Sequence, residues 1–446
     1  MKTSMILQLL LYLIFSIPFP IIIIIIFIFF YQRFCLPITK ATVFKTAPEC
    51  RAVIEASQFP DSRKNQLTQY EARAWPNQTL QRAFGIQNAF TTGDVTDVKK
   101  FVSKTHRLIR ASAVDWDDLS KTLSSMVQDM NWALADNDMS VSGGIQVKVT
   151  LAPMVRALAL RASLSVLFEM REGATIENRH LVDLGTIIHR TWISMKCGSE
   201  KVMEFKDNNI LKDRLAAVFA KHNVKIDFQN PHTNPLNLIL PSFETLWRIV
   251  LRLFIVLHNH RDYKQVLLEF IQKPTPTQFK LELGKEHISG EFLVKEALRL
   301  YPPTRRIRRA WLFPGSKHNR IIAADVEASQ LDTKVWGADA LQFNPARWRQ
   351  TSTSIIENRN LLAFGSPPFL CPASHGFGPM VIGLLVGILL SVAGDGCGGK
   401  WVLGSDDVAD VEEIQSGRRL RNDRGAYERV FLGRVDSNST SLSGAP

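Results

Sequence analysis

The chain of 446 residues is long enough to bury a large hydrophobic core, and its 46% hydrophobic and 22% charged residues are ordinary for a globular protein. This composition excludes disorder as the dominant state, and no linker or repeat divides the chain after its N-terminus, so we expect one large domain. The formal net charge of +12 comes from dispersed basic residues outside any recognisable nucleic-acid-binding motif. It favours a solvated basic face toward anionic lipid or an acidic partner.

The N-terminal segment, residues 1–33, predicts a membrane anchor. No charged residue lies between Lys2 and Arg33, and residues 6–31 are almost wholly apolar. A helix needs about 20 apolar residues to cross a bilayer, whereas a cleaved signal peptide has an apolar stretch of only about 7–15. A retained single-pass helix is therefore favoured over a signal peptide.

The distribution of basic residues around this segment predicts the topology of the chain. Arg33, Lys40 and Lys45 follow the apolar stretch, and only Lys2 precedes it. The positive-inside rule then places the remaining domain, residues 34–446, in the cytosol.

Apolar residues with helical spacing dominate the middle of the chain. They predict the helices 98–109, 116–130, 153–169, 180–195, 211–222, 236–257 and 263–271. Strand signals are short, and the better candidates are 321–326 and 430–435. The expected fold is mainly α with minor β, an α+β domain.

A second uncharged apolar stretch, residues 376–394, needs a separate interpretation. Gly378, Pro379, Gly383 and Gly387 interrupt it, and its helical part, 380–392, is too short to span a bilayer. We expect a buried core helix here.

Cys371 directly precedes this apolar helix and follows the loop 364–370. A thiolate at a helix start is stabilised by backbone N–H groups and the helix dipole, which lowers the thiol pKa and supports metal ligation. The alternative is a buried structural cysteine. Cys397 lies in a glycine-rich loop with no following helix, so it is the weaker ligand candidate. The cysteines are odd in number, scattered and without a CxxC pair, which fits reduced thiols: Cys35, Cys50, Cys197, Cys371 and Cys397.

Two further charged features lie upstream of Cys371. Glu296 and Arg299 stand three residues apart among apolar residues, where a carboxylate and a guanidinium can pair on one helix face. Arg347 follows in the segment Pro345-Ala346-Arg347-Trp348. Such pairs are usually solvated, but here a Pro-Pro stop and apolar neighbours surround the first one.

These segments, in this order, resemble the cytochrome P-450 family. Glu296 and Arg299 match its ExxR helix, Arg347 its PxRW-type segment, and Phe364 and Cys371 its cysteine loop. The resemblance is dense over residues 236–434 and thin before about residue 90. It implies a haem-thiolate fold in which Cys371 ligates the iron of haem b, while Glu296, Arg299 and Arg347 form a structural network that holds the loop.

The resemblance also implies residues on either side of the haem. Glu244 and Thr245 match the acid and hydroxyl of the family's distal helix, where they would relay protons to dioxygen; the alternative is a threonine bonded to its own helix and an exposed glutamate. Arg309 or, equally, Arg308 would bind a haem propionate. His106 and Arg110 match the family's C-helix motif only weakly, and we interpret them as a solvated charge run.

The cysteine loop departs from the family pattern. Pro367 stands where the family has glycine, and proline fixes φ and removes a donor. Ala373 replaces the glycine after the cysteine, and Phe369 stands where many members carry a propionate-binding arginine or histidine. The alternatives to an active enzyme are therefore a catalytically impaired, membrane-bound homologue or scaffold, and an enzyme that rearranges hydroperoxides without dioxygen.

The resemblance implies insertion of one oxygen atom from dioxygen into a small apolar substrate. Electrons would come from NADPH through a reductase docked on the basic surface. It further implies the endoplasmic reticulum membrane, with the catalytic domain in the cytosol. The loop around Cys371 and the helix around Glu244 look most like fungal members of secondary metabolism, whose substrates include terpenoids and polyketides. Phe243, next to Glu244, is expected to face the substrate.

Overall fold

A computed structural model of the chain describes most of the region after residue 40. The described ranges are 41–56, 64–110, 114–133, 145–170, 176–196, 203–222, 224, 226–258, 260–350, 360–393 and 400–435. The predicted anchor, Cys35, Cys197 and Cys397 lie outside these ranges. Among the described helices, none combines the length and apolar character needed to cross a bilayer.

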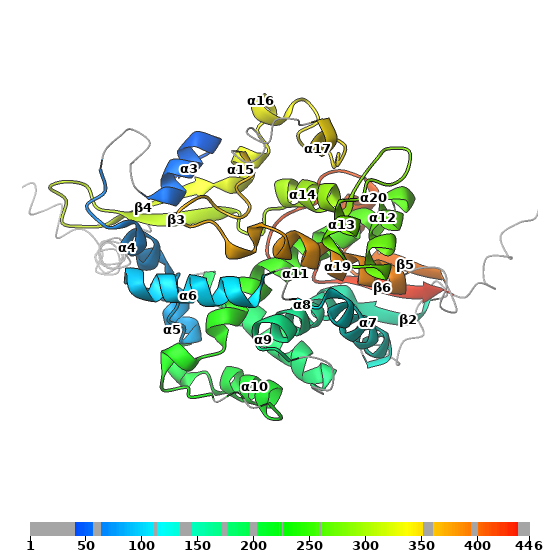
Figure 1. The fold of residues 1–446 in the computed structure, drawn as a ribbon, viewed down its shortest axis with the longest axis horizontal. Helices are drawn as coiled ribbons and strands as arrows, with labels where there is room; N and C mark the ends of the chain where they lie inside the picture. The colour runs from blue at the N-terminus through cyan, green and yellow to red at the C-terminus, as the bar shows by residue number, and fades with distance from the viewer. Residues whose placement is uncertain are drawn as a thin grey trace, which may run out of the picture.

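Helices make up most of the described part, as expected (Figure 1). The first group is α3 Ala47–Glu55, α4 Gln69–Ala74, α5 Gln78–Phe84, α6 Val95–Leu108, α7 Trp116–Ala133, α8 Leu151–Leu167, α9 Asn178–Lys196, α10 Asn209–Phe219 and α11 Leu236–His258. The second group is α12 Arg261–Gln272, α13 Pro276–Lys280, α14 Gly290–Leu300, α15 Val326–Gln330, α16 Thr333–Trp336, α17 Arg347–Gln350, α19 Phe377–Val392 and α20 Val408–Gln415.

All seven predicted helices are present, and two of them start at side-chain caps that hydrophobic spacing does not register. α6 begins three residues before the predicted 98 because the Asp94 side chain accepts a hydrogen bond from the Asp97 N–H at 2.9 Å. α10 begins at Asn209 because Asn208 caps it in the same way through the Leu211 N–H. Side-chain caps thus set these two helix starts.

Two small sheets lie toward opposite ends of the long axis in Figure 1. In the first, β1 (Thr42–Phe44) runs parallel to β4 (Arg320–Asp325), which pairs antiparallel with β3 (Arg306–Trp311). In the second, β6 (Val430–Val435) lies between β2 (Ile145–Thr150) and β5 (Lys400–Ser405), with both pairings antiparallel. The two strands predicted from sequence, 321–326 and 430–435, correspond to β4 and β6.

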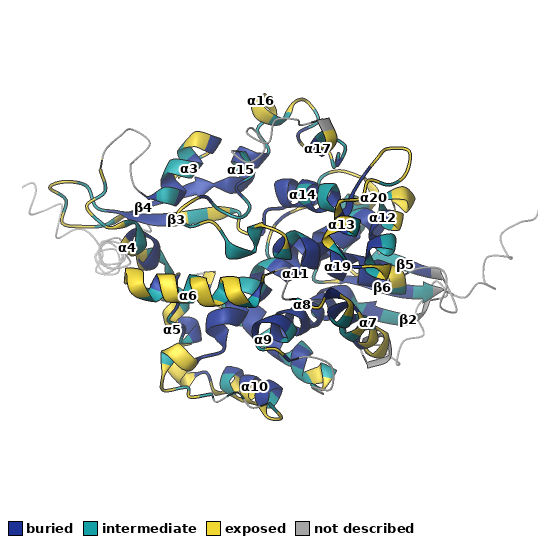
Figure 2. Ribbon diagram, viewed as in Figure 1, coloured by how far each residue is buried: buried dark blue, intermediate teal, exposed yellow. Residues whose placement is uncertain are grey.

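The hydrophobic core is built around three helices that pack on one another. α11 packs against both α8 and α19, and α19 also packs against α12 and α14. Figure 2 shows α8 and α11 almost entirely buried, whereas α6 is largely exposed. The apolar stretch after Cys371 is the buried core helix α19, which confirms that prediction. The described architecture is mainly helical with small sheets.

Candidate functional site

The loop before α19 folds tightly on itself and presents Cys371 at its end. Gly365 has a φ of 80°, in the left-handed region that favours glycine. The Phe369 N–H donates to the Ser366 carbonyl at 2.8 Å, and the Cys371 N–H donates to the Phe364 carbonyl at 2.9 Å. A single 3₁₀ turn, Pro372–Ser374, then leads into α19.

Close packing fixes this loop against the start of α19. A Cβ atom on Gly378 would lie 2.5 Å from the Ala373 carbonyl oxygen and 3.2 Å from the Phe364 ring. Only glycine therefore allows α19 to approach the loop this closely. Phe364, a predicted site residue, holds the loop both through its ring and through its carbonyl.

The thiol of Cys371 differs from the sequence expectation. Although part of the residue reaches the surface, burial of the thiol raises its pKa, and a hydrogen bond from the Ala373 backbone lowers it by less. Desolvation of the thiolate outweighs the N–H groups at the helix start in this unligated loop. The predicted lowering of the Cys371 thiol pKa is therefore wrong for the protein without a metal.

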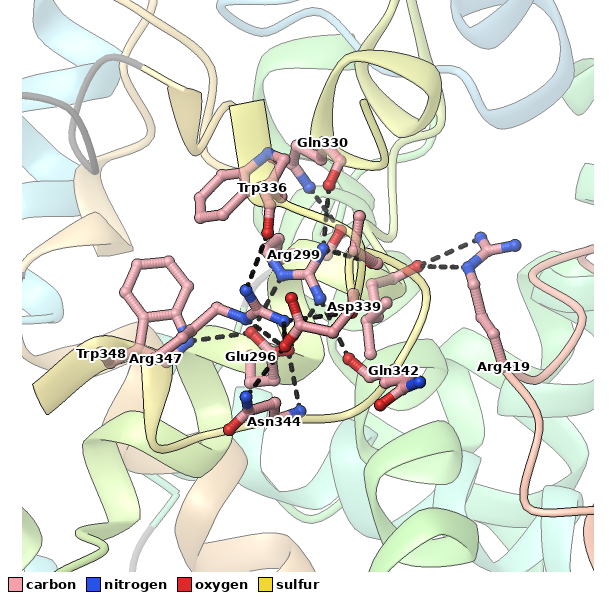
Figure 3. Close-up of polar contacts among 12 residues, drawn as sticks. Glu296, Arg299, Gln330, Trp336, Asp339, Gln342, Asn344, Arg347, Trp348 and Arg419 are labelled. Carbon is pink, nitrogen blue, oxygen red and sulfur yellow. Dashed lines mark hydrogen bonds and ion pairs between the residues drawn. The ribbon is translucent and has the colours of Figure 1, made fainter. Parts of the chain in front are cut away.

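Glu296, Arg299 and Arg347 come together in one network, drawn in Figure 3. Arg299 donates to both carboxylate oxygens of Glu296, at 2.9 and 2.7 Å, and both side chains are fully buried. The Nε of Arg347 donates to Glu296 Oε1 at 3.1 Å and its Nη2 to Asp339 Oδ2 at 2.9 Å. One carboxylate thus joins two arginines that lie far apart in the sequence.

Two other residues donate to the Glu296 carboxylate. The Trp348 indole donates to Glu296 Oε2 and the Asn344 N–H donates to Glu296 Oε1, both at 3.0 Å. Trp348 belongs to the motif recognised in the sequence, but Asn344 and Asp339 were not singled out. Every lone pair region of the buried carboxylate is therefore occupied by a donor, as a buried charge requires.

Gln330 connects this network to the cysteine loop and was missed in the sequence. Its side-chain amide donates to the carbonyls of Leu298 and Arg299, at 3.0 and 2.9 Å, and its Oε1 accepts from the Leu362 N–H at 2.7 Å. Leu362 lies two residues before Phe364. Since Gln330 stands alone at the end of the short helix α15, no periodicity or motif could have indicated this role.

Glu244 and Thr245 lie in the middle of α11, and their side chains make different kinds of contact. The Thr245 hydroxyl donates to its own helix, to the carbonyls of Pro241 at 3.1 Å and Ser242 at 3.3 Å, which is the alternative considered for it. Glu244 is buried, not exposed, and its Oε2 pairs with Arg424. Glu244 Oε1 is buried without a hydrogen-bond partner in the described part of the chain.

Of the two propionate-binding candidates, Arg308 is exposed on β3 and Arg309 is 4% exposed. Arg309 Nε donates to the Ile54 carbonyl at 3.1 Å and Nη1 to the Arg308 carbonyl at 2.9 Å. Burial, and then the nearby charge of Arg73, lower the pKa of Arg309 to about 9. Its guanidinium carbon lies 5.0 Å from the ring centroid of Phe369, two residues before Cys371.

The structure brings some of the predicted residues together and leaves others apart. Arg309 lies against the cysteine loop, and α14, which carries Glu296, packs on α19. α11 also packs on α19, but no hydrogen bond among the described residues joins Glu244 or Thr245 to Cys371. His106, in the last turn of α6, and Arg110, two residues after its end, are exposed, as expected of a solvated charge run.

Two clusters of arginines contribute to the basic charge: Arg305, Arg306, Arg308 and Arg309 at β3, and Arg418, Arg419, Arg421 and Arg424 after α20. Several of them pair with acidic side chains. Arg305 pairs with Glu327 and Asp423, and Arg306 pairs with Asp325. In the C-terminal cluster, arginines pair with acidic residues distant in sequence: Arg419 with Glu327, Arg421 with Asp410 and Glu413, and Arg424 with Glu244. Arg305, Arg306 and Arg421 are 39%, 54% and 45% exposed, so these pairs balance part of the positive charge at the surface, which composition does not show.

Comparison with known proteins gives short and distant sequence matches. No protein-family model matches the chain. A putative cytochrome P450 of Caenorhabditis elegans, CYP13A5, is 28% identical over 130 residues, which is 26% of this chain and 24% of that protein. Another from the same organism, CYP13A10, is 23% identical over 189 residues, 40% of this chain and 35% of that protein. The matches thus span about a quarter to a third of the length of these curated relatives.

Solved structures with a similar arrangement include two cytochromes P450 from different strains of Thermus thermophilus. One, a six-coordinated cytochrome P450, has a TM-score of 0.46 and 15% identity, with 78% of this chain and 83% of that chain covered. The other, CYP175A1, has a TM-score of 0.47 and 14% identity, with 78% and 80% covered. The relatives' names support a relationship to the cytochrome P450 family, but they give no support to the fungal secondary-metabolism affiliation.

Proposed function

We propose that the chain binds haem b through Cys371 and acts as a monooxygenase of the cytochrome P450 kind. The observation that carries the proposal is the buried network of Glu296, Arg299 and Arg347. This network reaches through Gln330 to the start of the loop that presents Cys371. The Glu296–Arg299 pair at its centre is fully buried, and such a pair is costly unless hydrogen bonds hold both charges in place. Here the backbone that it fixes carries a single cysteine.

The residues at the loop fit an iron-porphyrin. Cys371 offers one soft sulfur ligand, and Arg309 offers a buried cation with no acidic partner in the described part of the chain, as a propionate would need. When bound, the haem would supply dioxygen activation, with the thiolate favouring cleavage of the O–O bond. Phe364 and Gly378 would hold in place the loop that carries Cys371.

The proton-relay role would fall to Glu244 and Thr245. Glu244 Oε2 is held by Arg424, while Oε1 is left without a partner among described residues and can accept or release a proton through water. The Thr245 hydroxyl would have to turn away from the Pro241 carbonyl to take part. Glu244 is therefore the better placed of the two residues.

A second candidate function is haem binding without oxygen insertion. It is favoured by the Thr245 hydroxyl being engaged within its own helix, and by Pro367 in the cysteine loop. A third is dioxygen-independent rearrangement of a hydroperoxide, which does not need the distal acid and hydroxyl. All three functions use the same cysteine ligand.

The decisive experiment is a carbon monoxide difference spectrum of the reduced full-length protein. We expect a band near about 450 nm, typical of thiolate-ligated haem. The Cys371→Ala variant should lose this band, and Cys50→Ala should keep it, since Cys50 is buried beneath the first sheet. Absence of the band from the wild-type protein would rule out haem-thiolate function.

Turnover then separates the three candidates. Product formation that needs NADPH, dioxygen and a reductase supports the monooxygenase. Full turnover with a hydroperoxide alone supports the rearranging enzyme, and haem binding without either reaction supports the impaired homologue.

We propose a small apolar substrate and retain the terpenoid or polyketide class as the finer proposal. Phe243, expected to face the substrate, is fully buried. Its ring packs close to Gly185 of α9, where an added Cβ atom would lie 3.6 Å from the ring. If Phe243 lines the substrate site, that site would border α9 and α11. A panel of apolar ligands that shifts the haem Soret band, and fails to shift it in Phe243→Ala, tests this placement.

We further propose a single-pass anchor in the endoplasmic reticulum membrane, a cytosolic domain and an NADPH-dependent reductase as partner. The proposal is supported by the apolar residues 6–31 and the basic residues that follow them. Protease added to sealed microsomes should digest the domain. Protection of the domain from the protease would contradict this topology and place the domain in the lumen.

A further inference from the structure

Two buried arginines lie against the same aromatic ring of the cysteine loop. The guanidinium carbon of Arg73, from α4, is 4.3 Å from the centroid of Phe369, and that of Arg309, from β3, is 5.0 Å away. Phe369 precedes Cys371 by two residues, which span at most about 7 Å of chain. Both cations therefore lie close to the proposed iron ligand.

Neither arginine has an acidic partner among the described residues. Arg309 donates its hydrogen bonds to the carbonyls of Ile54 and Arg308. Arg73 is 6% exposed, and its Nε and Nη2 have no hydrogen-bond partner in the described part of the chain. Burial lowers the pKa of Arg73 to about 10.

Aromatic rings surround Arg73, but they do not accept hydrogen bonds from its N–H groups. Its guanidinium lies 5.6 Å from the Phe90 ring centroid and 6.0 Å from that of Tyr70. Rings attract a cation through their faces, but they leave the in-plane N–H groups of a guanidinium without acceptors. Burying two like charges together without an anion is unfavourable. We therefore expect a negatively charged group to bind beside them.

We propose that Arg73 is a carboxylate-binding residue of the haem site, with Nε and Nη2 donating side-on to one propionate. This inference rests on the proposed function and assigns a residue outside every motif found in the sequence. The side chain of Phe369 has no hydrogen-bond donor, and Arg73 places a cation over its ring. α4 thereby becomes part of the cofactor site.

The test compares two porphyrins that differ only in their carboxylates. Ferric iron-protoporphyrin IX and its dimethyl ester are loaded into full-length wild-type protein, Arg73→Gln and the control Arg82→Gln, whose residue is exposed on α5. Release into excess apomyoglobin is followed by absorbance. We expect Arg73→Gln to release the free acid about 10- to 100-fold faster, because a charge-assisted hydrogen bond is lost. The ester should leave wild type and Arg73→Gln at equal rates, and Arg82→Gln should match wild type for both.

Thermal unfolding of the haem-free proteins gives an independent readout. Removing a buried, unpaired charge should leave Arg73→Gln at least as stable as wild type. A structural role within the aromatic rings predicts instead a less stable haem-free variant and equal acceleration with both porphyrins, and that result would overturn the inference. Equal release rates of the free acid from wild type and Arg73→Gln would do the same. Failure of the wild-type protein to bind either porphyrin would overturn the proposed function, and this inference with it.

Discussion

Glu244 is 2% exposed in the middle of α11 and forms an ion pair with Arg424 from the C-terminal loop. The two partners differ in what each would keep if the other were removed. Arg424 is 23% exposed and its guanidinium lies 4.6 Å from the Trp192 ring centroid. Glu244 has no other hydrogen-bond partner for its Oε1 in the described part.

We therefore expect Arg424→Gln to lower the free energy of unfolding by about 3–5 kcal/mol, because it leaves a buried carboxylate unpaired. Glu244→Gln should cost less, and the double variant should be more stable than Arg424→Gln alone. Urea denaturation of the four proteins measures this, with the exposed Arg418→Gln as control. Equal costs for the two single variants would contradict the asymmetry.

Glu296 is the shared acceptor of Arg299 and Arg347, and its removal leaves the buried Arg299 without a carboxylate and Arg347 with Asp339 alone. Glu296→Gln should destabilise the protein by about 3–5 kcal/mol and weaken haem retention. Glu291→Gln is the matched control on the same helix, because Glu291 forms a partly exposed pair with Lys295 at 3.5 Å. That control should change stability by less than about 1 kcal/mol. Similar chemical denaturation curves for the two variants would show that the network does not hold the loop.

Thr245 can serve a proton relay only if its hydroxyl leaves the carbonyls of Pro241 and Ser242. If it does, Thr245→Val should lower the product formed per NADPH consumed, while Thr245→Ser should preserve this ratio. Because the side chain is only partly buried, both variants should unfold within a few degrees of wild type. Unchanged coupling in Thr245→Val would leave the hydroxyl with a purely local role on α11.

Glu428 should make the stability of the folded protein depend on pH in the acid range. Burial raises the pKa of this carboxyl. The neighbouring His189, whose Nε2 lies 3.2 Å from Oε1, and the charge of Arg156, 2.8 Å away, lower the pKa by more, so the net pKa is below the usual 4.5. A lowered folded-state pKa contributes stability above the usual value, and this contribution is lost as the pH falls through the folded value.

Glu428→Gln should therefore be less stable than wild type at neutral pH, and the difference should shrink below the usual carboxyl pKa of 4.5. Unfolding temperatures across this range measure the effect. The exposed Glu412→Gln provides the comparison. A difference that stays constant with pH would mean that the Arg156 and His189 contacts do not depend on the charge of Glu428.

The sequence by itself determined the helices from α6 to α12, the core helix α19, and the pairing of Glu296 with Arg299. These features are local. Helical periodicity, and residues three apart on one helix face, bring side chains together without reference to the rest of the chain.

The tertiary structure alone decided the features that depend on distant segments. It placed Arg73 over Phe369, joined Gln330 to Leu362, and paired arginines such as Arg419 with acidic residues distant in sequence. It also set the pKa of the Cys371 thiol, because desolvation depends on everything that packs around the sulfur. Each of these contacts joins segments remote in sequence, so no local pattern of residue types encodes them.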